Sequence, residues 1–219
     1  MGKPETDLAL RIRKKTLELL LEKEPEEIST RDIARACGVS ATSIYYYYKD
    51  KETLFTELKI FCIREMEEFI SGQISIKMSK WRRQGGIDGT IAEARAGLEA
   101  FRDWAFANPR MAHLVMGRLK ADTSNDSEKM ANYYRSTLFA KSILDRAVKE
   151  GLSSSKDTML DANLCIAAVW GAIESVLLKR TIPKYWTRRK GLDFTNSMID
   201  MLLAQLILKK NQSGKRKTY

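Results

Sequence analysis

The sequence has few of the residues on which disulfide-rich proteins, zinc sites and low-complexity chains depend. Its 219 residues include three cysteines, four prolines, 12 glycines and one histidine. Cys37, Cys62 and Cys165 are widely spaced and odd in number, with no Cys-x-x-Cys pair, so we expect neither a disulfide framework nor a zinc site. His113 alone cannot build a metal site or a catalytic triad. The sequence therefore predicts no metal, no cofactor and a reducing compartment.

Long hydrophobic runs are also missing. Charged residues recur through the first twenty positions, which argues against a signal peptide. The longest uncharged apolar stretch, residues 162–173, is shorter than the roughly 20 residues that span a bilayer. We expect a soluble, cytoplasmic protein with no membrane partner.

Enzyme motifs are absent as well. The sequence has no Walker loop, no Gly-x-Gly-x-x-Gly after a strand, no His-Glu-x-x-His and no Gly-x-Ser-x-Gly. A Cys–His pair would need a cysteine near His113, and no signature supports one. We predict that the protein is not an enzyme. A redox sensor at Cys37 is a minor alternative, since a packed small side chain explains that cysteine equally well.

The formal net charge of +10 is unevenly distributed. Residues 1–50 hold nine basic and nine acidic side chains, residues 51–80 hold five of each, and residues 81–219 hold 24 basic and 14 acidic. A basic surplus suggests a polyanionic partner. The surplus lies in short basic runs at residues 82–83, 179–180, 188–190 and 215–217. These side chains either form solvated surface or weakly attract DNA or an anionic effector.

Apolar residues recur at three- and four-residue spacing almost throughout, which predicts an all-α fold. The first predicted helix has Leu8, Ile12, Thr16 and Leu20 on one face and ends near Pro25. We expect the later helices at 29–37, 40–48, 50–76, 90–107, 109–120, 128–150, 157–180 and 191–210. Glycines at 85–89 and the polar segment 122–127 interrupt the pattern, and residues 211–219 form a basic, flexible tail.

Residues 28–55 carry the most specific pattern, that of a helix-turn-helix. Ser29 and Asp32 have the spacing of a capping box. Gly38 suits the left-handed residue after a helix, and Ser40 caps the next helix within three residues. Two short helices joined by a tight glycine turn make a helix-turn-helix, whose second helix enters a DNA major groove.

The second of these helices contains four consecutive tyrosines. Since each helical residue turns by about 100°, the four cannot share one face. Ile44 and Tyr48 fit the inner face, which leaves Tyr45, Tyr46 and Tyr47 at least partly exposed. Exposed tyrosines can bind phosphates through the hydroxyl and contact sugars or thymine methyls through the ring; alternatively, they pack on neighbouring helices.

The segment resembles the DNA-binding domain of the TetR (tetracycline-repressor-like) family of bacterial transcription regulators. The resemblance covers about residues 8–56 and depends on Gly38-Val39-Ser40, Ile44-Tyr45, Tyr47-Tyr48 and Lys51-Glu52-Thr53-Leu54. It implies DNA-contact roles for residues of both short helices and the next helix start, namely Thr30, Arg31, Ser40, Ala41, Thr42, Ser43, Tyr45, Tyr46, Tyr47 and Lys51.

Two of these residues have alternative roles. Arg31 is the one residue whose guanidinium group is placed to donate two hydrogen bonds to guanine. It could equally contact phosphate, or pair with Asp32 or Glu27. Lys51, in a first helical turn, opposes the helix dipole, which makes sense if it holds a DNA phosphate. Otherwise it is a solvated surface lysine.

The rest of the chain is expected to form a helical domain for effector binding and dimerisation. We place domain boundaries at 1–50, 51–210 and 211–219. The last two apolar helices favour a homodimer through a four-helix interface, which the resemblance also implies, at Leu164, Val169, Gly171, Ile173, Met198, Leu202 and Leu206. The resemblance further implies a small-molecule effector pocket, which we place at Phe101, Trp104, Met111, Leu114, Tyr133, Tyr134, Leu138 and Trp170; plain core packing is the alternative.

Together these features predict a transcription regulator that binds a pseudo-palindromic operator in double-stranded DNA as a dimer, and the resemblance implies that it is a repressor. A non-specific architectural DNA-binding protein is the alternative. It would bind random DNA as tightly as any chosen sequence, whereas a regulator prefers its operator by about 10³-fold or more.

Overall fold

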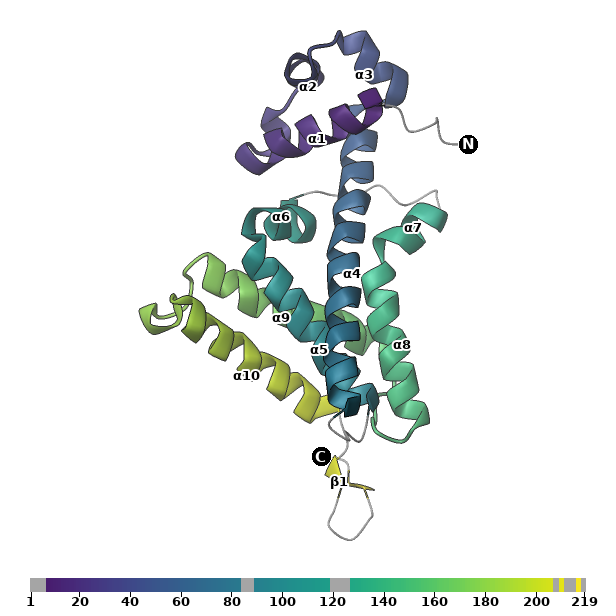
Figure 1. Ribbon diagram of the computed structural model, residues 1–219, viewed down its shortest axis with the longest axis vertical. Coiled ribbons are helices and arrows are strands. Elements are labelled where there is room, and N and C mark those ends of the chain that lie inside the picture. The colour runs from purple at the N-terminus through teal and green to yellow at the C-terminus, as the bar shows by residue number, and fades with distance from the viewer. Residues whose placement is uncertain (1–6, 84–88, 119–126, 207–208, 211–215, 218–219) are drawn as a thin grey trace. The chain divides into compact units, whose positions relative to one another are not determined.

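A computed structural model of the chain describes residues 7–83, 89–118, 127–206, 209–210 and 216–217 (Figure 1). The regular secondary structure of the described residues is helical except for one antiparallel pair of two-residue strands, β1 (Lys209–Lys210) and β2 (Arg216–Lys217). The all-α prediction is confirmed. Residues 122–126 of the predicted linker and most of the tail lie outside the described residues, and residue 127 is the first of a helix.

The first elements along the chain are α1 (Asp7–Glu22), η1 (Pro25–Glu27), α2 (Thr30–Cys37), α3 (Ala41–Tyr47) and the long α4 (Lys51–Arg83). They are followed by α5 (Gly89–Ala107), α6 (Pro109–His113), the π-helical turn η2 (Leu114–Arg118), α7 (Ser127–Tyr133), α8 (Arg135–Lys149), α9 (Thr158–Leu177), η3 (Pro183–Tyr185) and α10 (Arg188–Leu206).

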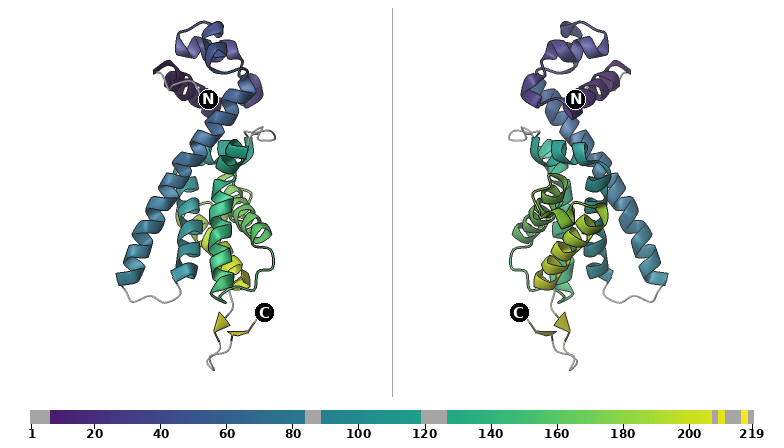
Figure 2. Two further views of the ribbon diagram at one scale, coloured as in Figure 1. Left: turned by 90° about the vertical axis from the view of Figure 1, so that its right-hand side faces the viewer. Right: turned by 90° about the vertical axis from the view of Figure 1, so that its left-hand side faces the viewer.

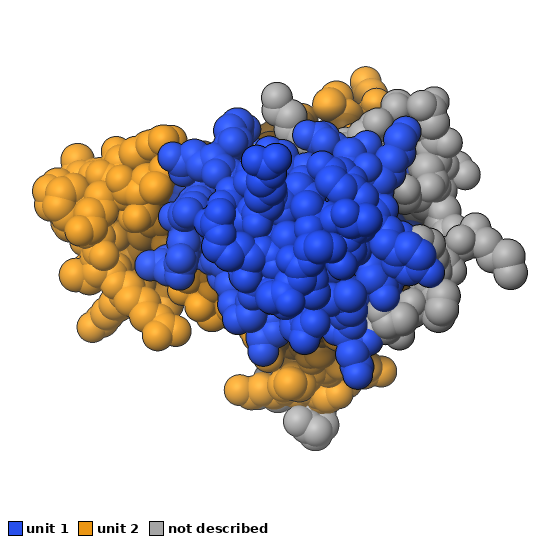
Figure 3. Space-filling view, turned by 90° about the horizontal axis from the view of Figure 1, so that it is seen from above, with its two compact units in different colours: residues 1–65, 110–133 blue, residues 66–109, 134–219 orange. Residues whose placement is uncertain are grey.

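The chain divides into two compact units (Figure 3). Unit 1 comprises residues 1–65 and 110–133, and unit 2 comprises residues 66–109 and 134–219. The single helix α4 contributes to both, with residues 51–65 in unit 1 and residues 66–83 in unit 2. This division differs from a boundary at residue 50, because the first half of α4 and the segment after α5 pack with the N-terminal helices.

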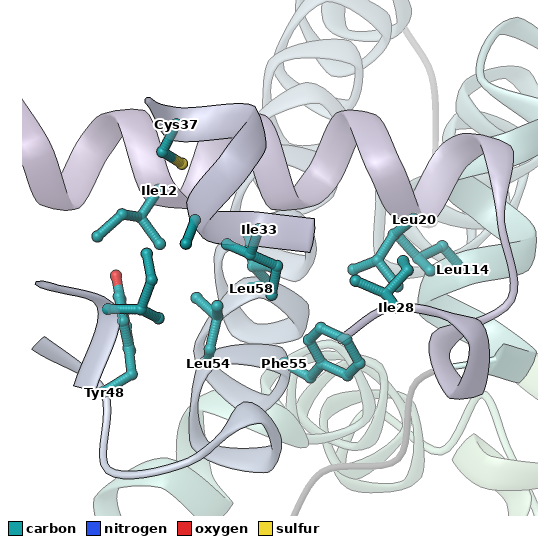
Figure 4. Packing of buried hydrophobic residues seen from close by; sticks show 12 residues of the cluster. Ile12, Leu20, Ile28, Ile33, Cys37, Tyr48, Leu54, Phe55, Leu58 and Leu114 are labelled. Carbon is teal, nitrogen blue, oxygen red and sulfur yellow. The ribbon is translucent and has the colours of Figure 1, made fainter. Parts of the chain in front are cut away.

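Unit 1 is organised around one apolar cluster, to which α1, α2, α3 and α4 each contribute buried side chains (Figure 4). Ile12, Ile33 and Leu58 are fully buried in it. Leu114, far along the chain in η2, is also fully buried there and lies beside Leu20. Full burial of a leucine or isoleucine side chain stabilises a fold by about 1.5–3 kcal/mol, so this cluster holds the short helices in place.

Unit 2 is a helical layer in which α9 packs against α5, α8 and α10 (Figure 2). Val169, Ile173 and Ile199 are fully buried between these helices. Polar contacts also join α5 to its neighbours: Arg95 pairs with Asp200 of α10 at 2.6 Å, and the buried Arg102 donates to the side chain of Asn196, also on α10.

Several helix boundaries differ from those expected. α4 continues to Arg83 instead of ending near Ile76, since no helix-breaking residue stands between them. The helix expected at 128–150 is two helices, interrupted at Tyr134, whose ψ of 11° is not helical. The helix expected at 109–120 changes to a π-helical turn at Leu114. α10 begins earlier than expected and ends at Leu206.

We predict that a methyl group at Gly191 destabilises unit 2. An added Cβ would lie 2.7 Å from Val176 Cγ1 and 3.3 Å from the Tyr185 carbonyl oxygen, and a valine cannot move aside easily. Gly191→Ala should therefore lower the free energy of unfolding in urea by about 1–3 kcal/mol.

Gly72→Ala in α4 is the matched control. Its Cβ would meet nothing within 4 Å, so higher helix propensity should raise the free energy of unfolding by up to about 1 kcal/mol. Equal effects of the two substitutions would contradict the assigned packing at Gly191.

Candidate nucleic-acid interface

The first short helix, α2, is capped at both ends as its sequence predicts. The Ser29 hydroxyl accepts the Asp32 N–H at 3.2 Å, and the Asp32 carboxylate accepts the Ser29 N–H at 3.0 Å, which confirms the capping box. Hydrogen bonds from the Ser29 side chain and backbone lower the pKa of Asp32. The carboxylate therefore stays ionised near the positive end of the helix dipole, where a negative charge is stabilising.

The turn between the two short helices depends on Gly38. Its φ of 66° and ψ of 36° lie in the left-handed region, which a Cβ disfavours. The Val39 N–H donates to the Ala34 carbonyl at 3.0 Å and the Gly38 N–H to the Arg35 carbonyl at 3.1 Å, a Schellman pattern that ends α2 sharply. Ser40 follows Val39 directly and caps the next helix, so α3 begins at Ala41, three residues after Gly38.

The recognition helix α3 presents one continuous exposed strip, which we call the recognition face and define as Ala41, Thr42, Tyr45 and Tyr46. Tyr45 and Tyr46 are 54% and 64% exposed, Thr42 is exposed and Ala41 partly so. On the opposite side, Ile44 is buried in the apolar cluster of unit 1.

Two further tyrosines hold the recognition helix rather than extend its exposed strip. Tyr48 is buried in the unit 1 cluster, and this burial raises its pKa to about 12. Tyr47 is partly buried, and its ring packs edge-on against Tyr46 with centroids 5.1 Å apart. The first two tyrosines of the run are therefore exposed, and the last two are partly or fully buried.

Ser40 and Ser43 use their hydroxyl groups within the helix cap. The Ser40 hydroxyl accepts the Ser43 N–H at 3.2 Å, and the two hydroxyl oxygens lie 3.0 Å apart. Ser40 is the expected N-cap. The structure therefore places both serines beside the recognition face, with hydroxyls already engaged.

Arg31 is exposed at the start of α2, next to Thr30. Asp32 is engaged by Ser29 and by Arg35 at 3.2 Å, and Glu27 accepts the Glu24 N–H at 3.0 Å. Among the residues that the structure describes, the Arg31 guanidinium has neither an ion pair nor a hydrogen bond. The alternative in which Arg31 pairs with Asp32 or Glu27 is therefore not what the structure contains.

Lys51 differs from both interpretations of its sequence position. Its ammonium group donates to the Pro25 carbonyl at 3.1 Å and lies 5.5 Å from the centroid of the Phe55 ring. It is therefore neither a solvated lysine nor one extended toward an outside phosphate. Instead it ties the first turn of α4 to the connection between α1 and α2. Asp50 caps the same turn, accepting the Thr53 N–H at 2.7 Å.

The three cysteines are buried thiols. Burial raises the pKa of Cys62 to about 12 and that of Cys165 to about 11, and it also raises the pKa of Cys37. Since the thiolate is the reactive form, none has the low pKa of a redox sensor. Cys37 packs in the unit 1 cluster, as a small apolar residue would.

The expected effector residues are divided between the two units. Leu114 and Met111 belong to the unit 1 cluster, and the Tyr133 ring lies under the Lys59 ammonium at 4.8 Å in the same unit. In unit 2, Phe101 and Trp104 are buried, Trp170 is partly buried, and Tyr134 and Leu138 are exposed. Leu114 is thus a core residue of unit 1.

Unit 2 contains a cavity that the sequence did not indicate. About 510 Å³ in volume, it is a shallow cavity, largely open to solvent, where the end of α4, the start of α5 and the end of α8 meet. Ile74, Met78 and Trp81 form an apolar side, and Thr90, Glu93 and Glu150 a polar one. The cavity depends on residues 76 positions apart in the chain, which no local pattern could join.

The polar side of this cavity is an ordered network. The Thr90 hydroxyl donates to Glu150 at 2.7 Å and accepts from Arg146 Nε at 3.1 Å, and Arg146 also pairs with Glu93. Arg146 therefore neutralises part of the negative charge of the cavity wall.

The expected dimer residues fall into two groups. Val169 and Ile173 have no exposed surface, so they are core residues of unit 2 and their assignment to an interface is corrected. The others reach the surface: Leu164 is 53% exposed, Gly171 is exposed, and Met198, Leu202 and Leu206 are partly exposed. Exposed apolar side chains of α9 and α10 that were not selected from the sequence include Met159, Leu160, at 54%, and Met201, at 67%.

By length and composition alone, α9 could cross a membrane. It packs against α5, α8 and α10 of unit 2. Its sequence also includes two charged residues, Asp161 and Glu174. These contacts are those of a core helix in a helical layer.

Comparisons with known proteins agree with this geometry. Residues 12–58 match the model of the family described as bacterial regulatory proteins, tetR family. A search of curated proteins gives no match. The solved structures that resemble the chain include one described as a tetR family transcription regulator from Shewanella sp. PV-4, with a TM-score of 0.72 and 16% identity over 93% of this chain and 100% of that one.

Two solved structures of proteins named FadR also have folds similar to that of this chain; one is described as a fatty acid degradation regulator and the other as a transcriptional regulator. FadR from Bacillus halodurans has a TM-score of 0.67 at 14% identity, covering 92% of this chain and 97% of that one. FadR from Bacillus subtilis, solved in complex with stearoyl-CoA, has a TM-score of 0.65 at 14% identity, covering 89% and 97%. These likenesses concern the fold.

A helix-turn-helix that carries the family's match, followed by a helical unit, defines a DNA-binding transcription regulator. Residues 12–58 form a DNA-binding domain of the TetR family of bacterial transcriptional regulators, and the fold of the chain is similar to that of solved regulators of this family. This is a family of regulators and not of enzymes, as the sequence predicted.

We predict that Lys51 stabilises unit 1 more than it attracts DNA. Lys51→Met keeps the apolar stem but removes the hydrogen bond to Pro25, so the free energy of unfolding in urea should fall by about 1 kcal/mol. Lys49→Met, at the neighbouring exposed lysine, should change it by less than about 0.5 kcal/mol. Unchanged stability of Lys51→Met, with a salt slope of DNA binding lowered by about one, would instead support the phosphate role.

Proposed function

We propose that the protein is a repressor that binds a pseudo-palindromic operator as a homodimer in the cytoplasm and is controlled by a small-molecule effector. The observation that carries the proposal is the exposed recognition face of α3, held by a capped turn on a packed cluster. Unit 1 would bind DNA, and unit 2 would dimerise and bind the effector. The most direct test is selection of bound duplexes from a random DNA pool.

Specific rather than architectural binding is favoured by the charge of the DNA-binding region. Residues 1–50 are neutral overall, with nine basic and nine acidic side chains. Non-specific binding depends on neutralising many phosphates with lysine and arginine. A neutral region has to rely on placed contacts, such as Arg31 and the tyrosines, and these depend on the sequence bound.

Dimerisation is supported by apolar side chains that a single chain leaves exposed on its last two helices. On α9, Leu160, Leu164 and Gly171 are exposed at near-helical spacing, and Met201 is exposed on α10. Gly171 leaves its surroundings open, since an added Cβ would meet nothing within 4 Å, so a second helix could approach closely there. A symmetric dimer would present two recognition helices to the two half-sites of an operator.

Effector binding is supported by the cavity in unit 2. Its apolar side, with Ile74, Met78 and Trp81, suits a small molecule with an apolar body. A similar fold, that of Bacillus subtilis FadR, was solved with stearoyl-CoA. Because α4 runs without interruption from the unit 1 cluster to this cavity, a shift of α4 would carry the signal to DNA binding. The effector has to bind one conformation more tightly than the other.

The dimer proposal predicts that a charge on the exposed α9 or α10 surface dissociates the protein. Leu164→Glu and Met201→Glu should each give a monomer by sedimentation at micromolar concentration. Each should weaken binding to the selected operator by about 100-fold, because the two half-sites no longer bind together.

Ile76→Glu is the matched control. Ile76 is 63% exposed on α4, close to the exposure of Met201. The substitution Ile76→Glu should leave both the oligomeric state and the operator affinity unchanged. A wild-type monomer at micromolar concentration, or a selected sequence without two-fold symmetry, would contradict the proposed dimer.

The effector proposal predicts that a bound ligand stabilises the protein and changes operator affinity. In a thermal-shift screen that includes stearoyl-CoA and other apolar small molecules, a ligand at 100 times its Kd should add about 2.7 kcal/mol to the free energy of unfolding. Trp81→Ala should abolish this shift. Trp186→Ala, at a tryptophan 43% exposed beyond α9, should preserve it. A shift that survives Trp81→Ala would place the ligand elsewhere.

A further inference from the structure

The recognition face of α3 lacks the groups that usually read base edges. Its members are an alanine, a threonine and two tyrosines, with no Arg, Lys, Asn, Gln, Asp or Glu among them. Discrimination of guanine or adenine in the major groove commonly uses a bidentate Arg, Lys, Asn or Gln. The neighbouring Ser40 and Ser43 hydroxyls are engaged with each other. The hydrogen-bonding groups that remain on this face are the hydroxyls of Thr42 and of the two tyrosines.

The same face offers several apolar groups at a suitable spacing. Ala41 and Tyr45 are four residues apart, as are Thr42 and Tyr46, so the four side chains form two adjacent rows on one side of the helix. The methyl groups of Ala41 and Thr42 and the two tyrosine rings are carbon surfaces. Thymine is the base that presents a carbon substituent, its C5-methyl, in the major groove, and alanine, threonine methyl and aromatic groups are its usual contacts.

Both rows are held in place by groups behind them. Tyr47 packs edge-on against Tyr46, and Ile44 is buried in the unit 1 cluster, which fixes the rotation of α3 about its axis. The Ser40 cap fixes where the helix begins, one residue before Ala41. An apolar contact needs such a fixed surface, because its free energy depends on the area removed from water.

We propose that α3 reads thymine C5-methyl groups, so that each operator half-site contains at least two neighbouring thymines recognised by their methyls. Arg31, on α2, lies outside this strip and contributes its contact separately. The inference rests on the proposed operator binding and adds the chemical feature by which the operator is chosen.

The test replaces thymine by deoxyuridine, which removes the C5-methyl and keeps the base pair. Duplexes selected from a random pool are remade with deoxyuridine at each thymine in turn, and the Kd of the full chain is measured by fluorescence anisotropy. At two or more positions in each half-site the affinity should fall about fourfold per methyl, since one buried methyl group is worth about 0.8 kcal/mol. Replacing guanine by 7-deazaguanine, which removes N7, reports any purine contact of Arg31 separately.

Thr42→Ser assigns one of these methyls. It removes a methyl group but keeps the hydroxyl, so it should abolish the effect of deoxyuridine at one position per half-site and leave the other positions sensitive. Thr53→Ser, whose hydroxyl belongs to the Asp50 cap on α4, is the matched control and should leave every position as sensitive as in the wild type.

The outcomes separate this inference from the function on which it rests. A pool that enriches no sequence overturns the operator proposal and this inference with it. An enriched, specific sequence whose affinity is unchanged by deoxyuridine at every thymine overturns the inference alone and leaves the operator proposal standing. Sensitivity to deoxyuridine that Thr42→Ser leaves intact at every position overturns the contact of Thr42.

Discussion

The shared apolar cluster of unit 1 is the contact on which the DNA-binding part of this protein depends. α2 has eight residues and α3 has seven, and helices of such lengths are not stable alone in water. Ile33 and Ile44 anchor them on side chains of α1 and α4. The caps at Ser29 and Ser40 and the left-handed Gly38 set where each helix begins and ends. Burial therefore supplies the stability, and local hydrogen bonds supply the geometry of the recognition face.

The same packing decides which polar groups are available to DNA. Asp32, Ser40, Ser43 and Lys51 are all engaged within unit 1, although each is a polar residue near the recognition helix. The groups that remain exposed include Arg31, Lys49 and a mostly apolar strip on α3. In a neutral region without a general attraction for phosphate, the side chains left over from the internal network determine the chemistry of recognition.

In unit 2 the helices are too uniformly apolar for their pattern to show which side is buried. α9 carries apolar residues nearly all round, so Leu164, Val169 and Ile173 were equivalent as interface candidates from the sequence. The contacts with α5, α8 and α10 bury Val169 and Ile173 and leave Leu164 at the surface. The cavity beside Trp81 arises in the same way, because it needs the ends of three helices that are distant in sequence.

The sequence by itself determined the helix-turn-helix, its caps and the side of α3 that faces outward, because these depend on residues within a few positions of one another. It also determined the all-α class, through an apolar spacing that persists along the chain. Only the tertiary structure decided the partner of Lys51, the burial of Leu114 in unit 1 and the exposed side of α9. Each of these depends on contacts between segments far apart in the chain, and such contacts leave no periodic or local signal from which they could be predicted.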